Sequence, residues 1–203
     1  MKNKNEIVEQ TKLAFDFIQK LYLETSYLVK EIEGILKEEA ENFIIGKPSG
    51  YGISSRSSTG LEASNVPSWL LRKFGVFFVE EAIAEIKGGA TITKLDQALK
   101  VFYLRVLLDD PKIHEPTIYS GVFYDIEKNP DNKKFTKFEH VMAYLEYQDA
   151  KVFINPQKIN HESSYMSIKG KFITKHLYDI NNSEDIRKLI IEPTLELYRS
   201  IKM

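Results

Sequence analysis

The sequence predicts an α+β fold: one long N-terminal helix, or two, followed by a four- to five-stranded mixed or antiparallel sheet with helices packed on its faces. Three observations lead to this expectation. A seven-residue apolar repeat fills the first forty residues, short apolar runs with short connections follow it, and helical patterns interrupt and end those runs. We expect a single domain over 1–203, comprising a helical segment 1–45, a loop 46–66 and a sheet-and-helix core 67–203.

Composition narrows the classes of function. The chain has 203 residues, 43% of them hydrophobic, which is enough to build a core without disulfides. Cysteine is absent, and this excludes thiolate metal sites, iron–sulfur clusters and cysteine nucleophiles. A net charge of −1 does not favour a nucleic-acid partner, because phosphate binding usually requires a basic excess. The first residues lack the apolar core of a signal peptide, and no apolar run is long enough to span a bilayer, so we expect a cytoplasmic protein without membrane contact.

The predicted N-terminal helix covers about residues 6–43 and is amphipathic. Its apolar repeat runs through Phe15, Tyr22, Val29, Leu36 and Phe43, at intervals of seven. Such a helix is roughly 55 Å long at 1.5 Å per residue, whereas a compact domain of this size is about 35–40 Å across. The helix therefore either breaks into two near the glycine at position 34, or projects and binds a partner, with a self-associating coiled coil as one form of that partnership.

The remaining elements follow from shorter patterns. Gly121 suggests a bulge within its strand, and Pro193 is expected to kink the last helix or restart it as a first-turn proline. The predicted strands cover 76–79, 98–108, 117–126, 151–154 and 165–173, and the further helices cover 80–87, 134–147 and 183 onward.

Segment 46–66 is the most unusual part of the chain, because it holds four of the ten glycines and many serines. Backbone amides in such loops can bind anions, and basic side chains would add charge. The spacing of a Walker-type phosphate loop is not met. If the loop binds an anion or a small ligand such as a nucleotide, the candidate residues are Lys47, Ser49, Gly50, Gly52, Arg56, Ser57 and Ser58.

Acidic residues end two of the predicted strands. Asp109 and Asp110 follow one strand, and Asp125 and Glu127 lie at the end of the next. In an antiparallel pair these two ends are far apart, whereas in a parallel or crossed arrangement they could converge on a divalent metal.

The order helix, three strands, helix, strand resembles the core of the PD-(D/E)XK nucleases over about residues 35–155. The resemblance implies a metal-dependent nuclease that binds Mg²⁺ or Mn²⁺ through Asp109 or Asp110 together with Asp125, with Glu39 or Glu41 added from the first helix. The chain departs from the family pattern at Glu127, which occupies the position of the family's lysine, while Lys128 is one residue further along.

Other combinations of residues give weaker signals. The histidines at 114, 140, 161 and 176 lack any metal-binding spacing, and no nucleophile elbow or dinucleotide fingerprint is present. Lysine–aromatic clusters at 133–138 and 169–172 could stack on bases, but phenylalanines in the core with lysines in solvent explain them equally. We therefore expect a non-catalytic binding or assembly module that needs no cofactor and uses its N-terminal helix to bind a protein partner or itself. The metal-dependent nuclease and the small-ligand sensor are the alternatives.

Overall fold

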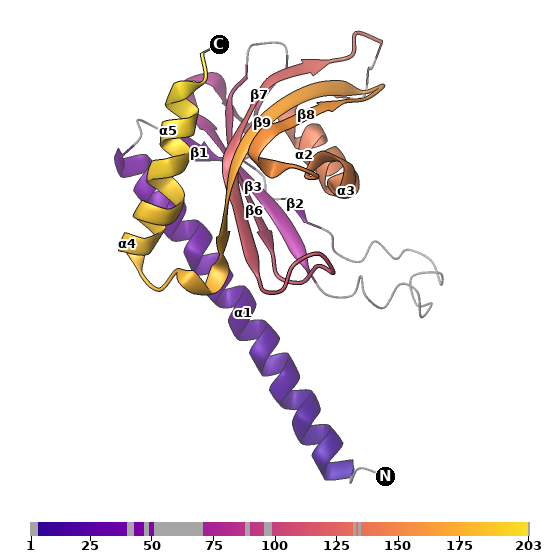
Figure 1. Ribbon diagram of the computed structural model, residues 1–203, viewed down its shortest axis with the longest axis vertical. Helices are drawn as coiled ribbons and strands as arrows, with labels where there is room; N and C mark the ends of the chain where they lie inside the picture. The colour runs from indigo at the N-terminus through magenta and orange to yellow at the C-terminus, as the bar shows by residue number, and fades with distance from the viewer. Residues whose placement is uncertain are drawn as a thin grey trace.

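The computed structural model describes residues 4–39, 43–46, 49–50, 71–87, 90–95, 99–131, 133 and 135–202, and confirms the α+β fold class (Figure 1). Its antiparallel sheet has the strand order β1-β3-β6-β7-β9-β8, and β2 also pairs with β3. Strands β4 and β5 form a separate two-stranded ribbon. The strands are β1 (Phe43–Ile45), β2 (Ser49–Gly50), β3 (Lys73–Glu80), β4 (Glu85–Lys87), β5 (Ala90–Ile92), β6 (Val101–Leu107), β7 (Thr117–Lys128), β8 (Ile159–Glu162) and β9 (Met166–His176).

Helices cover both faces of the sheet (Figure 1). One face packs against α1 and the C-terminal helices, and the other packs against α2 and α3. The central strand β6 is buried along its whole length, because helices cover the sheet on both sides. The helices are α1 (Lys4–Glu39), α2 (Phe138–Tyr147), α3 (Asp149–Val152), α4 (Ser183–Ile186) and α5 (Glu192–Ser200), with a π turn over Arg187–Ile191.

Helix α1 is a single unbroken helix of 36 residues, so of the two alternatives that the sequence left open, the break near Gly34 does not occur. Gly34 is exposed and has open space around it, whereas Ile32 and Ile35 beside it are buried against the sheet and hold the helix in place. The helix ends at Glu39, earlier than predicted. Phe43 instead begins β1, where its ring packs edge-on against Tyr198 at 5.1 Å between centroids.

Two short elements differ from the sequence prediction. The expected strand at 151–154 is the end of α3 and the turn after it, and the next strand is β8. A run of three apolar residues, Val152 to Ile154, has no periodicity that separates strand from helix, and Phe153 packs its ring on the sheet, 6.1 Å from that of Tyr119. The helix expected over 80–87 is a 3₁₀ turn, Glu81–Ile83, followed by β4.

The bulge expected at Gly121 lies further along β7. The register with β9 shifts between Tyr124 and Glu127, and Asp125 there has a positive φ of 48°. Gly121 is required for a different reason: a Cβ atom at this position would lie 2.2 Å from the backbone oxygen of Lys171. The glycine therefore allows β7 and β9 to approach closely.

For Pro193 the sequence left a kink or a restart open. It stands in the first turn of α5, directly after the π turn, and the backbone stays helical through Ile191 and Glu192, so the helix continues past the proline with a local change of hydrogen-bond pattern. None of the described helices combines the length and the apolar character needed to cross a lipid bilayer.

Candidate functional site: the N-terminal arm and the groove at its base

The N-terminal part of α1 extends beyond the rest of the molecule (Figure 1). The buried side chains of α1 begin at Thr25. Nearer the N-terminus, the Tyr22 hydroxyl donates a hydrogen bond of 3.0 Å to the carbonyl oxygen of Leu71 and ties the helix to the edge of the sheet. We call residues 4–20, which precede this tie, the N-terminal arm. The arm is about 25 Å long at 1.5 Å per residue.

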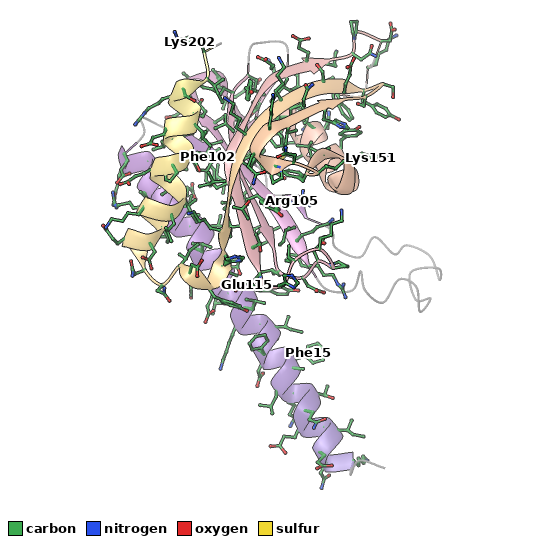
Figure 2. All side chains as sticks on the ribbon, viewed as in Figure 1. Phe15, Phe102, Arg105, Glu115, Lys151 and Lys202 are labelled. Carbon is green, nitrogen blue, oxygen red and sulfur yellow. The ribbon has the colours of Figure 1, made fainter. Side chains whose placement is uncertain are left out.

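The arm exposes large apolar side chains to solvent. Figure 2 shows Phe15 on the part of α1 that lies away from the sheet. Its exposed fraction is 58%, and those of the other large apolar residues are similar: Ile7 51%, Val8 45%, Leu13 61% and Phe17 62%. Single exposed apolar residues are common on protein surfaces, but several on three consecutive helical turns are typical of an interaction site.

A groove lies at the base of the arm, between α1 and the edge of the sheet. Its volume is about 540 Å³. One wall comes from α1, and the other comes from β1, β3 and Leu71, which precedes β3. The lining residues are Tyr22, Thr25, Ser26, Val29, Lys30 and Glu33 on α1, and Ile45, Leu71, Phe74 and Val76 opposite. The groove is thus largely apolar and begins where the arm ends.

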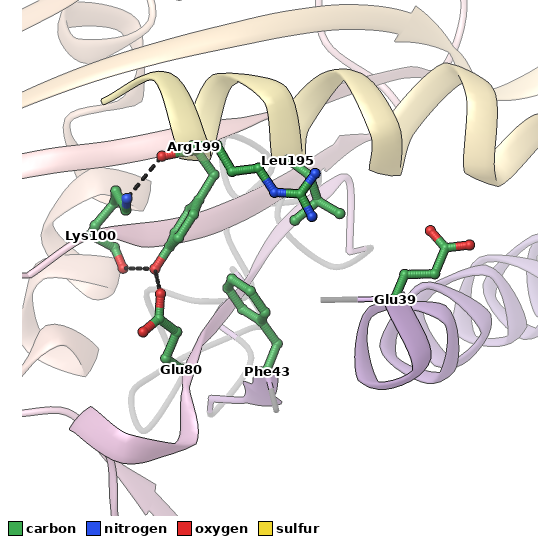
Figure 3. Close-up of a pocket in the computed structure, with 7 residues that line it drawn as sticks. Glu39, Phe43, Glu80, Lys100, Leu195 and Arg199 are labelled. Carbon is green, nitrogen blue, oxygen red and sulfur yellow. Dashed lines mark hydrogen bonds between the residues drawn. The ribbon is translucent and has the colours of Figure 1, made fainter. Parts of the chain in front are cut away.

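A second hollow, of about 320 Å³, lies beside the C-terminal end of α5 (Figure 3). The Tyr198 hydroxyl donates to a Glu80 carboxylate oxygen at 2.8 Å, and the Lys100 ammonium donates to the carbonyl oxygen of Tyr198 at 2.8 Å. Lys100 also lies over the Tyr198 ring at 4.0 Å. Burial lowers the pKa of Lys100, although the nearby Glu80 charge opposes this effect.

These contacts have a structural explanation. The last carbonyl groups of a helix lack partners within the helix, and a lysine that donates to them acts as a cap. Lys100 donates to the carbonyls of both Tyr198 and Ile201, so it fastens the end of α5 to the sheet. Burial raises the pKa of Tyr198, and its hydrogen bond to Glu80 adds to the shift, so the phenol remains a neutral donor. The hollow therefore owes its polar lining to the attachment of α5.

A buried arginine lies on the opposite face of the sheet. Arg105 has no exposed surface, and its guanidinium carbon is 4.5 Å from the centre of the Phe153 ring. Such stacking of a cation on an aromatic face is favourable, and more so when water is excluded. Arg105 therefore helps to hold the turn after α3 against the sheet. The sequence carries one signal for this contact, because Arg105 is a charged residue within the apolar run of the predicted strand 98–108.

The acids predicted from the strand ends are not brought together. Leu107 pairs with Thr117 and Val101 pairs with Phe123, so Asp109 and Asp125 lie at opposite ends of the β6–β7 pair. Seven residues of strand separate the two ends by about 20 Å. Each acid has its own cation: Asp109 pairs with Arg72 at 3.0 Å, and Asp125 with Lys169 at 2.9 Å.

The other predicted acids also lie apart. Asp110 accepts a hydrogen bond from the backbone N–H of Lys112, and Glu127 is exposed on β7 beyond the bulge. Glu39 at the end of α1 forms an ion pair with Arg187 at the start of the π turn, and both elements lie on the same face of the sheet. Glu41 lies outside the described residues. Among the described residues, no group of three His, Cys, Asp or Glu side chains could hold a metal ion.

Most of the predicted anion-binding loop lies outside the described residues, including Lys47, Gly52, Arg56, Ser57 and Ser58. The exceptions are Ser49 and Gly50, which form β2. Ser49 pairs with Gly75 and Gly50 with Phe74, next to the groove at the base of the arm. The sequence prediction did not include this groove, because its walls come from segments about fifty residues apart and carry no local motif.

Comparison of the chain with protein-family models, with curated proteins and with solved structures found no match.

Proposed function

We propose that this protein is a non-catalytic binding and assembly module whose N-terminal arm docks on a protein partner. The observation that carries the proposal is the exposure of Ile7, Val8 and Phe15 on one side of a helix that no other described element covers. Helix docking through residues three, four and seven positions apart is a common mode of protein recognition.

The position of the arm on a longer helix supports this role. An isolated helix of this length is marginal in water, because nucleation is costly. The arm continues a helix whose C-terminal half is already anchored by Leu28, Ile32 and Leu36, so that nucleation cost has been met. The apolar face is therefore preorganised, and a partner that binds it loses less affinity to ordering the arm.

The charges of the arm favour a protein over a nucleic acid. Its basic residues, Lys4, Lys12 and Lys20, are balanced by Glu6, Glu9 and Asp16. A surface that binds phosphates usually carries a basic excess. An electrically balanced helix that exposes large apolar side chains suits an apolar protein surface.

The contribution of single side chains can be estimated. Burial of a whole Val, Leu, Ile or Phe side chain yields about 1.5–3 kcal/mol. Phe15 is about half exposed, so docking would contribute roughly 1 kcal/mol from this residue alone. A charge in its place would cost more, because a carboxylate must also lose its water. Phe15→Glu is therefore expected to weaken binding at least tenfold.

Site-specific photo-crosslinking in cells that produce the protein tests the proposal. A photoreactive phenylalanine analogue at position 15 is expected to form adducts heavier than the monomer. The control is the same analogue at Lys20, which is also exposed on the arm but lies on the opposite face. The proposal fails if position 15 forms no adduct, or if both positions form the same adducts.

A further inference from the structure

The large apolar side chains of the arm are not confined to one side of the helix. Successive residues of an α-helix are turned by about 100° around its axis. Phe15 and Phe17 are two positions apart, so their side chains leave the helix about 160° from each other. Both are exposed, at 58% and 62%. The arm therefore carries an exposed aromatic ring on each of two nearly opposite sides.

The other exposed apolar residues of the arm lie beside these two rings or between them. Val8 lies about 20° from Phe15, and Leu13 lies about 40° from Phe17. Ile7 lies midway, about 80° from each of the two rings. Val8, Leu13 and Ile7 are all exposed. Together the five side chains occupy an arc of roughly 220° of the circumference, which we call the apolar arc.

The charged residues of the arm gather in the remaining sector. From Ile7 onward they are Glu9, Lys12, Asp16 and Lys20, and they fall within about 80° of one another. All four are exposed, and their charges cancel. We call them the charged strip. A charged sector of this kind faces water when the apolar part of a helix is covered.

The width of the apolar arc restricts the kind of surface that can cover it. A helix that packs on one surface typically buries a stripe about 100° wide, and the seam of a two-stranded coiled coil is narrower. A flat surface or a single helix laid on Phe15 would therefore leave Phe17 uncovered. Because the arm extends beyond the rest of the described molecule, walls can approach it from several sides (Figure 1).

From this distribution we propose that the partner of the arm is a protein with a deep apolar cleft, formed by two or more of its helices or strands, which encloses the arm on three sides. The inference rests on the proposed function and specifies the surface that the arm binds. Ile7 lies at the floor of the cleft, and Phe15 and Phe17 pack on its opposite walls. The charged strip stays at the mouth of the cleft, in contact with water.

The contact area favours enclosure over a one-sided contact. The arm is about 25 Å long, and a helix with its side chains is about 11 Å across. A stripe 100° wide then covers roughly 240 Å² of the arm, whereas the apolar arc covers roughly 530 Å². Counted on both partners, only the second value reaches the approximately 1,000 Å² that a specific interface needs. A one-sided contact along this arm is too small.

A lipid surface would also cover a wide apolar arc, but the charges of the arm do not suit one. Helices that lie on membranes usually carry an excess of Lys and Arg on their polar side, because the membrane surface is negatively charged. The charged strip carries two acidic and two basic residues. Its lack of net charge favours a protein cleft.

Photo-crosslinking at three consecutive positions tests the inference. The photoreactive phenylalanine analogue is placed in turn at Phe15, Asp16 and Phe17 in cells that produce the protein, and mass spectrometry identifies the adducts. We expect Phe15 and Phe17 to crosslink to the same polypeptide and Asp16 to form no adduct, although all three lie within about 3 Å along the helix axis.

The other crosslinking outcomes separate this inference from the proposed function. If position 15 forms an adduct and position 17 does not, the contact is one-sided, so the inference fails and the proposed function stands. The inference also fails if the two positions capture different polypeptides, or if position 16 crosslinks as strongly as its neighbours. If no position forms an adduct, both fail.

Binding of the crosslinked polypeptide gives a second test. Phe17→Glu is expected to weaken it at least tenfold, as Phe15→Glu does, whereas the matched control Asp16→Lys changes it less than about twofold. Equal circular dichroism and thermal midpoints would show that the three variants are folded. A loss of binding in Phe15→Glu alone overturns the inference. Sedimentation of the wild-type protein with vesicles of phosphatidylcholine and phosphatidylserine, but not of Phe15→Glu, would identify lipid as the covering surface and overturn both proposals.

Discussion

One fully buried hydrogen bond helps to attach α5 to the sheet, and its removal has a calculable effect. The Ser120 hydroxyl on β7 and the Thr194 hydroxyl on α5 lie 2.8 Å apart, and both residues are almost fully buried, at 1% and 0% exposed. Each hydroxyl is the hydrogen-bond partner of the other. The perturbation is therefore a cycle of three variants: Ser120→Ala, Thr194→Val and the double variant.

Each single substitution leaves one buried hydroxyl without a partner. A stranded buried group costs about 1–3 kcal/mol, whereas removing both partners and keeping the shape is nearly neutral. We therefore expect each single variant to lose roughly 2 kcal/mol of unfolding free energy, and the double variant to lose under about 1 kcal/mol. In a chain of this length, 1 kcal/mol corresponds to about 2–4 °C in the thermal midpoint.

Urea unfolding followed by circular dichroism measures the three differences at constant slope. The reasoning predicts a non-additive cycle, in which the second substitution restores most of the stability lost in the first. Additive losses, with the double variant the least stable of the three, would refute it. That result would mean that the two hydroxyls contribute independently, and that their contact does not help to fasten α5.

Three other predictions concern stability. Gly34→Ala should stabilise the protein by about 1 kcal/mol, because the site is exposed within a helix and has open space around it. Gly121→Ala should destabilise the protein by about 3 kcal/mol, because the added methyl group would clash with β9. Thermal unfolding measures both effects, and equal effects would contradict the packing argument. Burial, together with the nearby Lys151, lowers the pKa of His161 from its ordinary 6.5. As the pH decreases, the unfolded chain therefore takes up this proton before the folded protein does, so the unfolding free energy should fall as the pH decreases through 6.5. In His161→Gln this fall in unfolding free energy should be smaller. Tyr198→Phe should cost about 1 kcal/mol in urea unfolding, because the phenol is the donor to Glu80; an unchanged midpoint would show that this bond contributes nothing.

The parts of the fold that local pattern determines were predictable. The apolar runs of β6 and β7 and the heptads of α1 carry their structure in residues a few positions apart. Phe153 shows where this reasoning stops. The segment 151–154, which holds three apolar residues, forms a helix end and a turn, and its aromatic side chain packs on Tyr119 on the face of the sheet. Contacts between distant segments decide such short elements, and local spacing does not record them.

The candidate site was predictable to a similar extent. The apolar face of the arm follows from spacing alone, whereas the groove depends on bringing Phe74 and Leu71 beside Val29. The acids of the two strand ends show the same limit. Their separation follows from the antiparallel pairing of β6 with β7, which the order of elements left open. A site formed by two segments becomes visible only when their pairing is known.

The heptad pattern of α1 runs without change across the boundary between its buried and exposed halves. Phe15 and Val29 occupy equivalent positions, yet Val29 is buried in the core while 58% of Phe15 is exposed. No property of the residues themselves marks this boundary. The extent of the sheet sets it, because the last tie between the helix and the sheet edge is made at Tyr22. The apolar side chains of α1 pack on the protein's own core in its C-terminal half. Those in its N-terminal half are equally able to pack on another helix. The arm therefore needs no sequence signal of its own to act as a docking element.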